Sequence, residues 1–171
     1  MEIAIVSAAS IRIKGKLATL VVDPSLAKTK VTADATLILK RDSAEGGEVE
    51  GSRLTMSGPG EYEVGGVKIT GVKGGDCTAY YLSLDGISLL VTPVSSLKGK
   101  ESLRDVDIVI LLADALADPS ALATVTSGVA VFYGPQAEEN VKALGKEVQK
   151  VEKYSIAREK LPQEMEVILL A

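Results

Sequence analysis

The sequence predicts one α/β (α+β) domain over residues 1–171, a β-rich αβ/βα sandwich of two mixed β-sheets with few helices. Strand patterns fill almost all of the first half, whereas strands alternate with helices in the second half. Three predominantly apolar runs are typical of strands buried on both faces: Ala35–Leu39, which includes Thr36, Val106–Leu112, which includes Asp107, and Val129–Tyr133. The chain is long enough to bury a real core, and no linker divides it.

The first quarter of the chain predicts a β-meander. Alternating or β-branched residues mark three strands, Glu2–Val6, Ser10–Lys14 and Leu17–Val22. Asp23-Pro24 ends this meander. The polar segments on either side of the first apolar run, Ser25–Thr32 and Lys40–Arg53, are predicted to be loops.

The central stretch Leu54–Val72 predicts a β-hairpin. Ser57-Gly58-Pro59-Gly60 reverses the chain, because glycine allows positive φ and proline fixes φ. Alternation of polar and apolar residues then predicts two strands, Glu61–Val64 and Val67–Thr70, joined by a Gly-Gly turn. Asp85-Gly86 is a second strong turn signal, between the predicted strands Ala79–Leu84 and Ile87–Thr92.

Helices are expected in the second half. A helical turn is predicted within Ser95–Leu103, and Asp118-Pro119 predicts a capped helix over Pro119–Thr126. The best helix opens at Gly134-Pro135, where four apolar residues recur at helical spacing: Ala137, Val141, Leu144 and Val148. Glu166–Leu170 closes the chain as a strand.

Composition excludes several classes of function. The net charge of −4 offers no basic surface for nucleic acid. The start of the chain lacks the basic region of a signal peptide, and no run approaches the roughly 20 apolar residues that span a bilayer. Cys77 has no second cysteine to pair with, so we expect a cytoplasmic protein. Mean hydropathy of +0.22 favours an apolar surface covered by a protein partner or a second copy, most simply in a homo-dimer.

The segment S-G-P-G-E-Y-E-V-G-G-V-x-I resembles the middle of small metallo-β-lactamase-superfamily proteins, a branch of zinc-dependent metal hydrolases. Met1–Asp23, with Val22-Asp23-Pro24 at its end, resembles their opening meander, and Ala33–Leu39 resembles the strand before the metal site. Three further segments resemble their later strands and last helix: Thr78–Leu90, Asp105–Leu112 and Val141–Leu170. The resemblance covers nearly the whole chain and implies a metallo-β-lactamase-like sandwich.

The resemblance also locates a metal site whose ligands are missing. The family holds one or two metal ions with a His-x-His-x-Asp-His loop, two more histidines and a bridging aspartate, and this chain contains no histidine. The matching positions are Lys40, Asp42, Ala44 and Glu45 in the loop, the shortened segment Lys73–Cys77, Val94 near the aspartate, and Gly134 near the last histidine. Zinc sites use several imidazole or thiolate ligands. One cysteine and no histidine therefore exclude a zinc hydrolase, and we expect no cofactor.

Other chemistries remain open at this stage. Asp42, Glu45 and Asp76 would suit a hard cation such as Mg²⁺ or Ca²⁺, or they are simply solvated. Cys77 is a nucleophile without a histidine base, or a small buried apolar residue. A serine nucleophile, Ser57 or Ser95, paired with a lysine base is a further candidate, but the sequence spacing favours no particular pair.

We favour a non-catalytic protein of this fold that acts as a binding or assembly module. The alternative is a hydrolase whose cleft is rebuilt with carboxylates and a hard metal. For the former metal cleft we expect Lys40 or Arg41 to pair with an acidic neighbour and fill the place of the metal. Each exposed ion pair contributes only about 0–1 kcal/mol to the stability of the folded protein. The competing hypothesis leaves all these charges in water on a loop.

Overall fold

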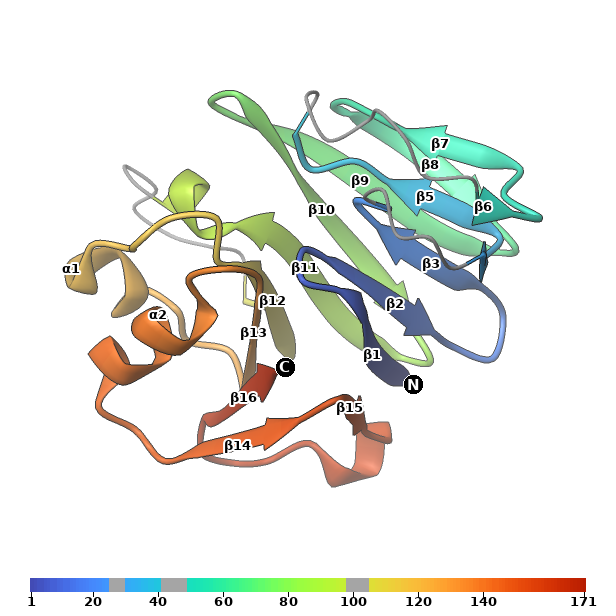
Figure 1. Ribbon diagram of the computed structural model, residues 1–171. Helices are drawn as coiled ribbons and strands as arrows, with labels where there is room; N and C mark the ends of the chain where they lie inside the picture. Colours follow the sequence, from blue (N-terminus) through green and yellow to red (C-terminus); the bar gives the residue numbers. More distant parts are fainter. Residues whose placement is uncertain (25–29, 41–48, 98–104) are drawn as a thin grey trace.

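The computed structural model describes residues 1–24, 30–40, 49–97 and 105–171, and within them two mixed β-sheets lie face to face (Figure 1). The six-stranded sheet has the order β15-β1-β2-β3-β5-β7. Its strands β1, β2 and β3 are antiparallel, and β3, β5 and β7 are parallel. Their bounds are β1 (Glu2–Ser7), β2 (Ser10–Lys14), β3 (Thr19–Val22), β5 (Ala35–Leu37), β7 (Leu54–Met56) and β15 (Lys153–Ser155).

The eight-stranded sheet has the order β14-β16-β13-β12-β11-β10-β9-β8. It is antiparallel from β8 to β11 and parallel from β11 onward. Its strands are β8 (Gly60–Val64), β9 (Val67–Gly74), β10 (Cys77–Leu84), β11 (Ile87–Pro93), β12 (Ile108–Leu112), β13 (Val129–Tyr133), β14 (Val148–Val151) and β16 (Glu166–Leu170).

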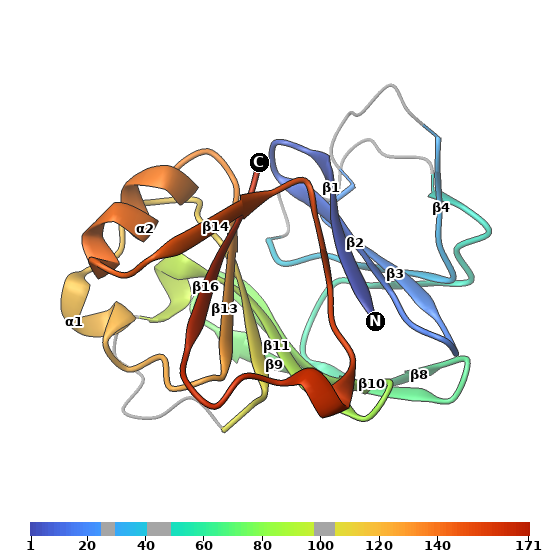
Figure 2. The same cartoon turned by 90° about the horizontal axis from the view of Figure 1, so that it is seen from below.

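The helices cover the outer face of the eight-stranded sheet. In Figure 2, α1 (Pro119–Leu122) and α2 (Ala137–Leu144) lie on the side of β13 and β16 that faces away from β1, β2 and β3. Short 3₁₀ turns follow β11 and β15, η2 (Val94–Leu97) and η3 (Arg158–Lys160). A separate parallel pair joins β4 (Val31–Thr32) to β6 (Val49–Glu50). Among the described residues, none of the helices has the length and apolar character to cross a membrane.

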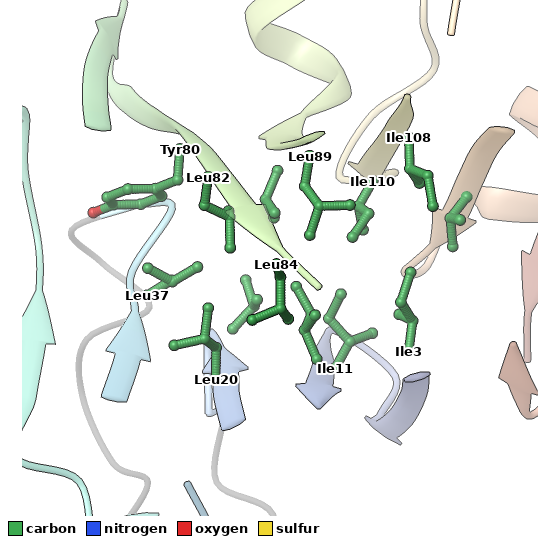
Figure 3. Packing of buried hydrophobic residues seen from close by; sticks show 14 of the residues in the cluster. Ile3, Ile11, Leu20, Leu37, Tyr80, Leu82, Leu84, Leu89, Ile108 and Ile110 are labelled. Atoms are coloured by element: carbon green, nitrogen blue, oxygen red, sulfur yellow. The ribbon is translucent and has the colours of Figure 1, made fainter. Parts of the chain in front are cut away.

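The core explains why strands such as β12 and β13 are apolar at every position. Between the sheets, Ile3 and Leu20 meet side chains such as Leu84 and Ile110 (Figure 3). Alternate residues of the same strands, such as Val109 on β12, point the other way and pack under the helices. A strand buried on both faces needs apolar residues at every position, not every second one.

The predicted fold class is confirmed, and several element boundaries are wrong. The strand predicted over Val106–Leu112 begins at Ile108, and the helix predicted over Pro119–Thr126 ends at Leu122. The helical turn predicted within Ser95–Leu103 is η2, which starts at Val94 and ends at Leu97; residues 98–104 lie outside the described part.

Val148 belongs to β14 and not to the best-predicted helix. Gly145 ends α2 at φ 62°, with its N–H donating to the carbonyl of Lys142. A left-handed glycine is a common helix terminator. After it the chain turns back to run beside β16, so the apolar spacing that suggested one long helix spans a helix and a strand.

Strands also occur where loops were predicted. β4 lies within Ser25–Thr32 and β6 within Lys40–Arg53, each only two residues long. β14 and β15 were not predicted at all. Such short strands are stabilised by tertiary pairing, which local alternation does not reveal.

Candidate functional site

Strand ends from both sheets gather at one edge of the sandwich. Parallel strands bring their carboxyl ends to the same side, where ligands bind in many α/β proteins. Val94, Asp114 and Gly134 follow β11, β12 and β13, which are parallel neighbours. From the other sheet, Lys40 follows β5 and forms an isolated antiparallel bridge with Cys77 at the start of β10.

The backbone on both sides of Leu39 fixes the position of Lys40. The Leu39 N–H donates to the Asp23 carboxylate at 2.8 Å, and the Leu39 carbonyl accepts from the Thr78 N–H at 2.8 Å. Thr78 lies on β10 of the opposite sheet. The segment after β5 therefore crosses from one sheet to the other, and Lys40 stands where the two sheets meet.

Lys40 is paired with a carboxylate that the sequence analysis did not consider. Its Nζ donates to Asp114 Oδ2. Asp114 also accepts hydrogen bonds from the Ser95 N–H at 3.2 Å and from Ser95 Oγ at 2.7 Å. The Asp114 side chain is 12% exposed and that of Lys40 is 39% exposed. The pair is thus more enclosed than an ordinary surface ion pair.

The pKa of Asp114 reflects two opposed effects. Burial disfavours the carboxylate and by itself raises the pKa. The hydrogen bonds from Lys40 and Ser95, together with the positive charge of Lys40, outweigh burial and hold the pKa of Asp114 below its usual value. The folded protein therefore favours the ionised form of Asp114.

Tyr133 ends β13, and its backbone carbonyl accepts from the N–H of Ala113, the residue before Asp114, at 2.7 Å. The tyrosine is fully buried, and its hydroxyl has no hydrogen-bond partner within the described part of the chain. Burial raises the pKa of Tyr133, and the negative charges of Asp23 and Asp114 raise it further. Asp23 is itself 2% exposed and has φ 40°, a left-handed conformation that is uncommon for aspartate.

We call Asp23, Lys40, Ser95, Asp114 and Tyr133 the strand-end cluster. Only Lys40 was among the residues singled out for the former metal cleft. Asp114 was detectable, because it follows a fully apolar parallel strand almost directly and such positions lie at the functional edge of a sheet. Nothing in the local sequence indicated that Lys40, 74 positions away, would pair with it.

The other predicted positions supply no ligands. Val94 is an apolar residue, 1% exposed. Gly134 has φ 104°, and a Cβ there would lie 2.9 Å from Leu112 Cδ1, so a histidine would not fit without displacement. Asp76 is exposed in the turn before β10. Arg41, Asp42 and Glu45 lie outside the described residues.

The environment of Cys77 favours its interpretation as a small buried apolar residue over that as a nucleophile. It is 7% exposed, and its Sγ donates to the Gly74 carbonyl at 2.7 Å. Reactive cysteines are accessible and lie in electropositive surroundings with a base. A histidine base does not exist in this chain.

The donor set does not fit zinc. Within the described ranges, no three His, Cys, Asp or Glu side chains are grouped as a metal site would require. The strand-end cluster offers carboxylate, hydroxyl and phenol oxygens, whereas zinc sites are built mainly from nitrogen and sulfur. The Lys40 ammonium on Asp114 further opposes a dication by charge repulsion.

Comparisons with known proteins identify the fold. No protein-family model and no curated protein matches the sequence. The structure of a Thermotoga maritima protein described as a "putative zn-dependent hydrolase of the metallo-beta-lactamase superfamily" superposes with TM-score 0.72 and 17% identity, covering 99% of this chain and 98% of that one. A "putative metal-dependent hydrolase" from Parabacteroides distasonis gives TM-score 0.57 and 14% identity, covering 96% and 91%.

Proposed function

We propose that this chain, which has the metallo-β-lactamase fold, is a non-catalytic binding or assembly module. A fold does not determine function, so the proposal depends on the residues of the strand-end cluster. The observation that supports it best is the Lys40–Asp114 ion pair at the edge where strands from both sheets end. A lysine ammonium lies where the resemblance locates the first metal-ligating histidine.

The remaining groups of the cluster support the same conclusion. Ser95 Oγ donates to Asp114 Oδ2, and that oxygen also accepts from Lys40. A serine nucleophile needs an adjacent base to take its proton. An ionised aspartate already neutralised by an ammonium is a poor base, because its pKa is held below the usual range. The cluster therefore stabilises structure better than it activates a nucleophile.

Metal content tests the proposal first. We expect the purified protein to retain far less than one zinc per chain after dialysis, and EDTA to leave its Tm unchanged. A bound structural metal contributes directly to folding free energy. Stoichiometric zinc together with a Tm that falls by several degrees in EDTA would show that the proposal is wrong.

Hydrolytic activity tests the alternative function. The parent and Asp114→Asn would be assayed on phosphodiester, phosphomonoester and lactam substrates, with magnesium, calcium or manganese in turn. We expect no turnover that depends on Asp114. Turnover that requires a hard cation and is lost in Asp114→Asn would favour the rebuilt hydrolase over the module.

A further inference from the structure

We propose that a second copy of this chain pairs with the free edge of β14 and continues the eight-stranded sheet across a two-fold axis. An edge strand presents unpaired N–H and C=O groups, which are a template for a strand of another chain. The inference rests on the proposed function, because it names the surface through which a binding or assembly module associates with itself.

β14 ends the eight-stranded sheet. Among the described residues, β14 pairs with β16 on one side and with no strand on the other. The side chains of Gln149 and Lys150 in its middle are exposed. The outer edge of β14 is therefore open to a further strand.

The direction of the main chain shows which residues of β14 face outward. The Ala171 N–H donates to the Val151 carbonyl at 3.2 Å, so the main-chain groups of Val151 face β16. Along a parallel strand, successive residues direct these groups to opposite sides. Gln149 consequently faces β16 as well, and the N–H and carbonyl groups of Val148 and Lys150 point away from the sheet.

Charge and direction together limit how two copies of β14 can pair. A two-fold axis gives an antiparallel pair in which opposite residues both face the partner or both face away. A register centred on Lys150 sets it opposite itself, and one centred on Val148 sets Lys146 opposite Lys150. Like charges directly opposite destabilise a sheet. A register centred on Val151 needs the main chain of Glu152, whose carbonyl already accepts a hydrogen bond from β1.

The register centred on Gln149 has none of these conflicts. It sets Val148 opposite Lys150 on both sides of the axis, so that outward N–H and carbonyl groups meet. Gln149 lies on the axis opposite itself, and its carboxamide both donates and accepts hydrogen bonds. At the two ends, Lys146 of one copy stands opposite Glu152 of the other. The strand is thus complementary to its own copy in charge and in hydrogen bonding.

Lys150 does not prevent this pairing, although a lysine on an edge strand usually keeps other strands away. Its Nζ donates to Glu138 Oε1 of α2 at 2.7 Å within the same copy. This ion pair balances the charge of Lys150. The aliphatic part of the lysine side chain can then pack on Val148 of the other copy.

The opposite edge of the same sheet is not suited to pairing with itself. β8 carries two exposed glutamates, Glu61 and Glu63, which alternate with Tyr62 and therefore lie on one face. A two-fold register centred on any of these residues sets a glutamate opposite a glutamate, which is unfavourable. The edge strands of the six-stranded sheet, β7 and β15, have three residues each, against four in β14. β14 is accordingly the edge that fits a second copy.

Sedimentation equilibrium of the purified protein tests the proposal. A pairing of four-residue strands is small beside the roughly 1,200–2,000 Å² buried in stable complexes, so we expect a weak dimer that is populated at high micromolar concentration. Lys150→Pro removes an outward N–H that the two-fold symmetry uses twice, and it should lower the association constant about tenfold or more. Glu63→Pro makes the matched change on β8 and should leave the association constant unchanged.

Charge substitutions on the axis test the register. Gln149→Glu and Gln149→Lys each set like charges opposite one another, so each variant should associate several-fold more weakly than the parent. An equimolar mixture of the two variants pairs opposite charges and should associate more tightly than either variant alone. These changes leave the main chain intact, so they decide the question if Lys150→Pro does not fold.

Several outcomes would overturn the inference. A monomer at high micromolar concentration would refute it, as would a dimer that a folded Lys150→Pro variant forms as tightly as the parent. A dimer weakened equally by Glu63→Pro, or by Leu116→Ser at an exposed position after β12, would place the second copy elsewhere. A mixture of the Gln149 variants that associates no more tightly than each alone would refute the register. The zinc and turnover assays bear on the proposed function, so a monomer without metal or turnover would overturn this inference alone.

Discussion

The hydroxyl of Tyr80 on β10 donates to the carbonyl of Met56 on β7 at 2.8 Å, across the interior of the sandwich. The same hydroxyl lies 3.1 Å from the Ile38 carbonyl, and Figure 3 shows the ring above Leu37. Burial raises the pKa of Tyr80 well above its usual value, with a smaller contribution from Tyr62. The hydroxyl thus stays protonated and bonds one sheet to the last strands of the other.

Tyr80→Phe should therefore destabilise the protein. This substitution removes the hydroxyl that lies within hydrogen-bond distance of the Met56 and Ile38 carbonyls, and it keeps the aromatic ring. We expect a loss of about 1–2 kcal/mol in the free energy of unfolding, measured by urea denaturation. An unchanged urea midpoint would mean that other donors replace the hydroxyl.

Tyr133→Phe should have the opposite or no effect. Its hydroxyl has no hydrogen-bond partner in the described part of the chain, so the folded state gains nothing from it and bears its desolvation. We expect the free energy of unfolding to be unchanged or to rise by up to about 1 kcal/mol. Destabilisation comparable to that of Tyr80→Phe would reveal a partner for the hydroxyl, such as bound water.

Asp114 should make stability depend on pH. Its pKa is lower in the folded protein than in the unfolded chain, so its contribution is fully present above the unfolded value of about 4. The contribution is lost as pH falls through the lower folded value. In urea titrations we expect Asp114→Asn to have a lower free energy of unfolding than the parent at pH 7. We expect this difference in the free energy of unfolding to narrow below pH 4. A constant difference across this range would exclude ionisation as the cause.

Restoring histidines should not restore zinc binding. Lys40→His, Asp42→His and Glu45→His together rebuild part of the loop motif suggested by the resemblance. Val94 and Gly134 would still supply no ligand, and a Cβ at Gly134 would lie 2.9 Å from Leu112 Cδ1. We expect calorimetry to show no zinc affinity tighter than that of the parent. Submicromolar binding by the triple variant would contradict this.

Self-association remains a prediction from the mean hydropathy. Among the described residues, the large apolar side chains that are exposed are Leu17 at 66% and Leu116 at 64%. Leu116 lies two residues after Asp114, next to the strand-end cluster. If a second copy covers this region, light scattering should give a dimer that Leu116→Ser weakens and Leu17→Ser does not. A monomer at high micromolar concentration would count against a homo-dimer.

The sequence predicted the sandwich because its strands carry strong local signals. The strands β12 and β13 are apolar throughout, β5 is apolar except for Thr36, and Asp85-Gly86 forms the turn between β10 and β11. The absence of histidine excluded the zinc ligand set from composition alone. These properties depend on residue type and spacing, so no three-dimensional information was needed.

Tertiary structure alone decided what stands beside Lys40. The chain crosses between the sheets after β5, and parallel pairing places Asp114 at the same edge, 74 positions later. Likewise, the left-handed Gly145 ends α2, and Val148 then pairs beside β16. Residue patterns specify which face of an element is apolar, but not which strand ends converge. That convergence follows from the packing of whole sheets, and it determines which charges neutralise one another.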